Sequence, residues 1–158
     1  MNAFKDNTEI ITRSPEETEA LGRRIGQLLK GDELIALFGG LGMGKTAFVR
    51  GLAAGLDVPS DEVSSPTFAI VHEHEGRVML YHFDMYRVES WDDLYSTGFF
   101  DYLGNGVVVT EWSENIEGAL PEERIDIEIS APGHDDTRIF RIHAPDALPP
   151  TEGIDETI

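Results

Sequence analysis

Residues 34–46, LIALFGGLGMGKT, decide the fold of this 158-residue chain. The apolar run of residues 34–38 is bounded by polar residues and glycines, which is typical of a buried strand. Residues 39–46 then match the pattern G-x-x-x-x-G-K-[ST], and a helix is expected from Lys45 to about Leu56. In such a strand–loop–helix unit, backbone N–H groups of the loop and the helix N-terminus converge on phosphate oxygens. The segment is therefore predicted to be a phosphate-binding loop, or P-loop.

The polar side chains of this loop have defined roles in nucleotide binding. Lys45 is expected to reach the β- and γ-phosphates, and the hydroxyl of Thr46 is a natural Mg²⁺ ligand. Further nucleotide contacts are expected from Gly42, Met43, Gly44 and Ala47.

A P-loop NTPase also needs a carboxylate at the end of a neighbouring strand to position Mg²⁺. Glu111 follows the apolar run of residues 107–110, and Asp84 follows the expected strand of residues 78–83. The chemistry of a carboxylate alone supports Glu111 and Asp84 almost equally as the acid that positions Mg²⁺. Glu111 is favoured as the metal acid because its run is more uniformly apolar, and Asp84 would then orient or activate the attacking water. His82 shares a strand face with Asp84 and would either orient that carboxylate or simply pack.

Composition excludes several classes of protein. Thirty acidic against twelve basic residues give a net charge of −18, which should repel a nucleic-acid backbone, so direct DNA or RNA binding is not expected. No apolar run is long enough for a membrane span. The absence of cysteine excludes thiolate chemistry and is compatible with a cytoplasmic location.

The remaining patterns complete an α/β prediction, a P-loop NTPase-like three-layer sandwich with a mixed, partly antiparallel sheet. Ser14 and Glu17 form a capping box for an early helix that Gly31 ends, and Ser90 caps a short helix through Tyr95. Two antiparallel hairpins are expected, the first from residues 68–72 and 78–83, and the second from residues 125–130 and 138–143.

Residues 1–143 are expected to form a single domain. Residues 144–158 contain three prolines, four acids and no base, and are predicted to be a disordered tail.

Three functional classes remain open. The [NT]-K-x-D signature of guanine binding is absent because no lysine follows Lys45, so ATP is the favoured nucleotide. Arg124 is the only arginine between Glu111 and Ala131. A small-molecule kinase would be expected to carry an arginine-rich lid, so this scarcity makes the kinase interpretation weaker. The chain is therefore a motor-like ATPase subunit, a small-molecule kinase, or a nucleotide-dependent scaffold that needs no hydrolysis.

Four aromatic side chains leave a structural alternative open. They form either a docking surface or part of the core: Tyr81, Tyr86, Trp91 and Tyr95.

A set of motifs in a fixed order resembles the TsaE family, also known by the older name YjeE. The resemblance covers residues 10–143 and rests on GLGMGKTAFVRG (40–51), SPTF (65–68), HFDMYR (82–87), GF (98–99) and EWSE (111–114). Met43 and Ala47 stand where alanine and threonine are usual, and the acidic tail is not a family feature.

The resemblance implies a small P-loop ATPase required for threonylcarbamoyladenosine at position 37 of tRNAs that read ANN codons. It implies ATP and Mg²⁺ as ligands, with Glu111 as the second Mg²⁺ ligand and Asp84 as the residue needed for hydrolysis. Residues 64–68 would form a switch-like loop, and Trp112 would belong to the nucleotide-responsive region. Ser14 and Arg138 fall near positions that contact the adenosine.

The resemblance also implies partners. TsaB and TsaD would form the transferring enzyme, and this chain would dock on them as an ATPase that is weak alone. Its contact with tRNA would be indirect, through that complex.

Overall fold

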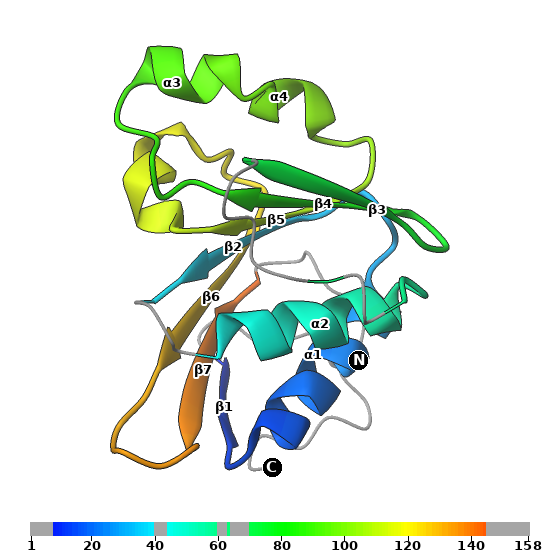
Figure 1. Ribbon diagram of the computed structural model, residues 1–158, viewed down its shortest axis with the longest axis vertical. Helices are drawn as coiled ribbons and strands as arrows, with labels where there is room; N and C mark the ends of the chain where they lie inside the picture. The colour runs from blue at the N-terminus through cyan, green and yellow to red at the C-terminus, as the bar shows by residue number, and fades with distance from the viewer. Residues whose placement is uncertain (1–7, 40–43, 60–62, 64–69, 145–158) are drawn as a thin grey trace.

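The computed structural model describes residues 8–39, 44–59, 63 and 70–144. Its centre is a seven-stranded sheet in the order β1-β7-β6-β2-β5-β4-β3 (Figure 1). The strands are β1 (Thr8–Thr12), β2 (Leu34–Phe38), β3 (Val71–Glu75), β4 (Met79–Asp84), β5 (Val107–Glu111), β6 (Ile125–Ser130) and β7 (Arg138–His143).

The sheet is mixed, as predicted. The four central strands β6, β2, β5 and β4 run parallel, while β3, β7 and β1 pair antiparallel with their neighbours. Both expected hairpins are present. The first is displaced from its predicted position, because Glu75 pairs with Met79 and His74 therefore lies in β3 rather than in the turn.

Helices cover both faces of the sheet and make three layers (Figure 1). Helices α1 (Pro15–Leu28) and α2 (Lys45–Gly55) lie on one face, and α3 (Trp91–Ser96), α4 (Phe99–Tyr102) and the 3₁₀ helix η2 (Ser113–Ala119) lie on the other. Strand residues alternate between the two cores: Ile35 and Leu37 pack under α1 and α2, whereas Leu34 and Ala36 pack under α3 and η2.

Helices α1 and α2 pack with their backbones in contact, because glycines lie at their crossing. A Cβ atom on Gly51 would lie 1.9 Å from the carbonyl oxygen of Glu19, and one on Gly22 would lie 2.3 Å from that of Phe48. This close packing fixes the position of α2 against α1, and α2 begins at the predicted P-loop lysine, Lys45.

Some predicted features lie outside the described residues. These are Gly42 and Met43 of the loop, the switch-like segment 64–68, and residues 145–158 of the predicted tail. The first residue of that tail, Ala144, is buried in the core under α1 and α2. In the part of the chain that the structure describes, no helix is long and apolar enough to cross a membrane.

Candidate active site at the strand ends

The two candidate acids are neighbours at the carboxyl ends of two adjacent parallel strands. Asp84 is the last residue of β4 and Glu111 is the last residue of β5, and the two are paired in register. Because β2 runs parallel to β5, its carboxyl end lies at the same edge and leads toward Lys45. Ligands of open α/β sheets bind outside the carboxyl ends of parallel strands, so the position is suited to a nucleotide.

The alternation of side chains places both acids on the α2 face of the sheet. Leu80 and Val109 pack into the core under α1 and α2. Residues two and four positions further along a strand point the same way, so His82, Asp84 and Glu111 also face that layer. The strands therefore direct the acids toward the helix that begins with Lys45.

Lys45 is nearly buried, with 5% of its surface exposed. Its Nζ donates a hydrogen bond of 3.0 Å to the carbonyl oxygen of Gly39 and lies 4.6 Å from the centroid of the Trp112 ring. Gly44, the residue before it, has φ +87°, a left-handed conformation that glycine adopts without strain. Thr46 and Ala47 follow in the first turn of α2, both half-buried. The ammonium group is thus held at the start of α2, where the helix dipole also favours an anion.

Glu111 has a buried partner that the sequence did not predict. Its Oε2 is hydrogen-bonded at 2.5 Å to Nε2 of His82, whose side chain is fully buried. His82 thus positions Glu111 rather than Asp84. The two residues lie on different strands, β4 and β5, so no pattern within one segment of the sequence signals their contact.

Asp84 lies in a different environment, half-buried beside Glu111. Its Oδ1 accepts a hydrogen bond of 2.9 Å from the backbone N–H of Tyr86. Burial raises the pKa of the Asp84 carboxyl above its ordinary value, and the negative charge of Glu111 raises it further. Two neighbouring carboxylates with different partners are suited to different roles, one as a ligand and one as a base.

Trp112 forms a wall of the site. It has φ +59°, a left-handed conformation that is uncommon for a large side chain, and its ring packs edge-on against Tyr86 at 5.0 Å between centroids. The hydroxyls of Thr110 and Ser113 hydrogen-bond at 2.6 Å and hold this turn. Such a conformation persists only where its surroundings fix it, and it is frequent at functional sites.

Glu114 links η2 to the start of the loop, a contact missed at the level of sequence. Its Oε2 accepts a hydrogen bond of 2.9 Å from the backbone N–H of Gly39. The EWSE motif therefore contributes a metal-acid candidate, an aromatic wall and a clamp on the loop.

Arg138 reaches the loop from β7. A Cβ atom on Gly44 would lie 3.8 Å from both Cγ and Nε of Arg138. Its Nη1 donates to the carbonyls of Asp135 and Thr137, but its buried Nε has no hydrogen-bond partner among the described residues. A buried guanidinium nitrogen without a partner is costly in a folded protein unless a ligand supplies an acceptor.

Ser14 has a structural role in the described fold. Its hydroxyl accepts a hydrogen bond of 3.1 Å from the N–H of Glu17 and caps α1, as the capping-box pattern predicts. Thr18, one turn further along α1, lies against Gly44. The structure thus brings Lys45, Asp84, Glu111, Trp112 and Arg138 to the end of the loop, whereas the side chain of Ser14 is engaged in the cap.

Comparison with known proteins identifies a family. The family model described as threonylcarbamoyl adenosine biosynthesis protein TsaE matches residues 12–140. The tRNA threonylcarbamoyladenosine biosynthesis protein TsaE of Bacillus subtilis is 41% identical over 130 residues, which cover 81% of this chain and 80% of that protein. The protein of the same name from Aquifex aeolicus is 39% identical over 135 residues, which cover 84% and 96%.

A solved structure agrees with the sequence relatives. The crystal structure of YdiB from Bacillus subtilis superposes with a TM-score of 0.68 and 32% identity, covering 92% of this chain and 90% of that one. The predicted three-layer fold is confirmed. The chain belongs to the TsaE family and thus to the proteins of threonylcarbamoyladenosine biosynthesis in tRNA.

Proposed function

We propose that the protein is a P-loop ATPase that binds ATP with Mg²⁺ and serves the formation of threonylcarbamoyladenosine at position 37 of tRNAs reading ANN codons. One observation carries the proposal: Asp84 and Glu111 are register partners at the sheet edge where Lys45 begins α2. A cation at a helix N-terminus beside two carboxylates is the arrangement that phosphoryl transfer requires.

The described residues fit both ligands. The partnerless Nε of Arg138 and the ammonium of Lys45 are donors for phosphate or nucleotide oxygens. Thr46 and Glu111 would hold Mg²⁺, which in proteins is usually bound by one or two oxygen side chains together with phosphates and water. When bound, the ion neutralises charge that develops on the phosphate oxygens.

The side chains would then divide the work. Lys45 would exchange the carbonyl of Gly39 for a phosphate oxygen. His82 holds Glu111 in one orientation, so the metal acid needs little rearrangement. Asp84, whose pKa is raised by burial, would accept the proton of the attacking water, because a carboxylate with a higher pKa is the stronger base.

The net charge supports the proposal that partner subunits, and not this chain, bind the tRNA. A chain of net charge −18 is a poor RNA ligand, so TsaB and TsaD would hold the tRNA and carry out the transfer in the cytoplasm. Only weak turnover is expected without them, because a small open site excludes water poorly.

Calorimetric titration with ATP, with and without Mg²⁺, tests the nucleotide site. Lys45→Ala should nearly abolish ATP binding, while Lys30→Ala, which removes an exposed lysine, should leave it unchanged. Glu111→Gln should bind ATP but lose most of the Mg²⁺ dependence. Unchanged ATP affinity in a folded Lys45→Ala protein would refute the proposal.

A further inference from the structure

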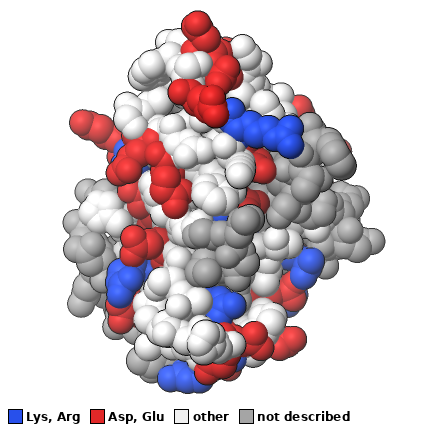
Figure 2. Space-filling view, turned by 60° about the vertical axis from the view of Figure 1, so that its left-hand side comes forward, with Lys and Arg blue, Asp and Glu red and all other residues white. Residues whose placement is uncertain are grey.

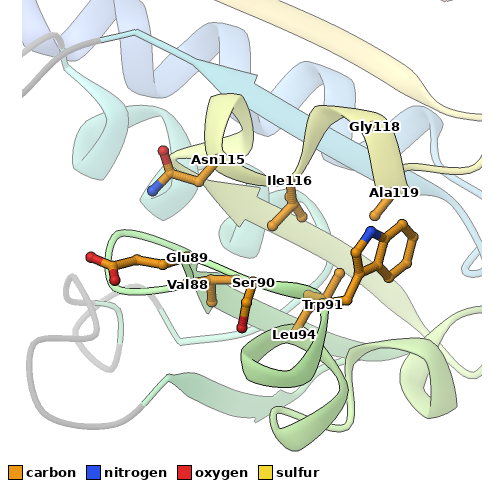
Figure 3. A pocket seen from close by; sticks show the side chains of 9 residues that line it. All are labelled: Val88, Glu89, Ser90, Trp91, Leu94, Asn115, Ile116, Gly118 and Ala119. Atoms are coloured by element: carbon orange, nitrogen blue, oxygen red, sulfur yellow. The ribbon is translucent and has the colours of Figure 1, made fainter.

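A groove lies between α3 and η2, outside the candidate active site (Figure 3). Residues 88–91 and Leu94 line one wall, and four residues of η2 line the other: Asn115, Ile116, Gly118 and Ala119. Its volume is about 300 Å³. Figure 3 shows Trp91 at one end of this α3–η2 groove and Glu89 and Asn115 at the other.

The groove has an apolar floor and an exposed aromatic rim. Leu94 of α3 and Ile116 of η2 are buried, at 2% and 4% exposure. Trp91 of α3, which lines the groove, is 56% exposed, and Tyr95 of the same helix is 64% exposed. The rings of Trp91 and Tyr95 both pack on the ring of Phe100, and these contacts restrict the side-chain conformations of both residues. Fixed, exposed aromatic side chains beside an apolar hollow are typical of protein interfaces. Of the alternatives that the sequence left open, Trp91 and Tyr95 are thus surface residues.

Acidic charge predominates on the α3 wall of the groove. Residues 88–96 carry three carboxylates and no Lys or Arg, with Arg87 directly before them, and Glu89 lines the groove itself. Figure 2 shows acidic side chains gathered on the upper part of the face in view, at the height at which α3 lies in Figure 1, with basic side-chain atoms beside them. Electrostatic complementarity therefore favours an occupant that places Lys or Arg around an apolar anchor.

The groove is also connected to the two acids. Its walls are the segments that directly follow Asp84 and Glu111 in the chain. Asn115 ties these segments together, because its Nδ2 donates to the carbonyls of Met85 at 2.9 Å and Tyr86 at 3.1 Å. An occupant of the groove would contact both segments and bias the positions of both carboxylates.

We infer that the α3–η2 groove is the docking site for a basic segment of a partner protein, with one large apolar side chain inserted beside Trp91. The inference rests on the proposed function in one respect: the partner is the TsaB–TsaD pair. The partner's Lys and Arg side chains lie over the acidic rim, and docking acts on Asp84 and Glu111 through the two linked segments.

Calorimetric titration of the purified TsaB–TsaD pair with variants of this chain tests the site. Trp91→Ala removes an exposed side chain that lines the groove, and Glu89→Lys with Asp92→Lys reverses charge along the wall formed by residues 88–94. Asp32→Lys with Glu75→Lys is the matched control, because it makes the same change in net charge at the opposite edge of the sheet. ATP affinity of each variant alone reports whether it is folded.

The groove variants should bind the pair at least ~10-fold more weakly, the scale of a hot-spot residue, while the control and wild type bind alike. Added salt should weaken wild-type binding more than that of the charge-reversed variant. If the groove variants bind the pair as wild type does, the docking site is refuted and the proposed function stands. If wild type binds ATP but not the pair, the partner and the docking site both fail.

Discussion

At the scale of single residues, the two carboxylates of the site differ in what surrounds them. Glu111 is held by a buried histidine, and Asp84 is held by a backbone N–H in a half-buried position. The motif and the two apolar runs predicted Lys45, Asp84 and Glu111 as site residues, and the structure places both acids at the carboxyl ends of adjacent strands and Lys45 at the start of α2. The partnership of His82 with Glu111 could not be predicted, because it depends on the register between β4 and β5, which is a tertiary property.

The raised pKa of Asp84 predicts a pH-dependent stability effect. A carboxyl whose folded-state pKa exceeds its unfolded value of about 3.8 binds protons more tightly when folded, so its ionisation costs stability as pH rises through the raised pKa. Asp84→Asn removes that charge but retains an acceptor for Tyr86. In buffer without metal or nucleotide, the variant should melt at a higher temperature than wild type at pH 7, and this gain should vanish near pH 3. A variant that melts lower at pH 7 would contradict the cause assigned to the shift.

His82 is expected to act through Glu111. His82→Phe removes the hydrogen bond to Glu111, the proposed Mg²⁺ ligand, and should weaken Mg²⁺-dependent ATP binding by at least ~10-fold, the usual scale for a residue that orients a metal ligand. ATP binding without Mg²⁺ should change little, and His82→Gln, which retains a donor, should recover part of the loss. Equal losses with and without Mg²⁺ would assign His82 a purely structural role.

At the scale of elements, local pattern predicted those segments that carry their own signals. Helix α1 has a capping box and β2 lies between charged and glycine residues, so both were placed correctly. Strand β1 was missed, because its five residues form a strand only by pairing with β7, which is distant in the chain. Strand β3 was displaced for a similar reason: its polar sequence VHEHE has no apolar alternation that would fix the register.

The crossing of α1 and α2 should not tolerate a methyl group. Gly51→Ala places a Cβ 1.9 Å from a backbone oxygen of α1, so the helices must separate. The cost of overpacking, about 1–3 kcal/mol or more, exceeds the gain of ~1 kcal/mol in helix propensity. A lower free energy of unfolding is therefore expected by urea titration. Gly118→Ala is the control, because nothing lies within 4 Å of its Cβ, and a destabilisation equal to that of Gly51→Ala would disprove the packing argument.

At the scale of the whole molecule, the net charge of −18 supports the proposal that the chain acts together with a protein partner. In the described residues, Lys45 lies at the start of α2, Glu111 is hydrogen-bonded to His82, and Asp84 accepts a hydrogen bond from the backbone N–H of Tyr86. The acidic surface favours a basic protein partner over RNA. Fold class and this charge were both evident from sequence, whereas the groove between α3 and η2 was not, because its walls come from separate segments of the chain.

Steady-state phosphate release with and without the TsaB–TsaD pair tests most directly the proposal that the protein is an ATPase that its partners stimulate. Wild type should release phosphate slowly alone and faster with the pair. Asp84→Asn should bind ATP with Mg²⁺ yet turn it over at least ~10²-fold more slowly with the pair, the scale expected for loss of a general base. Phosphate release by Asp84→Asn at the wild-type rate, or a wild-type rate that the pair does not change, would contradict the account.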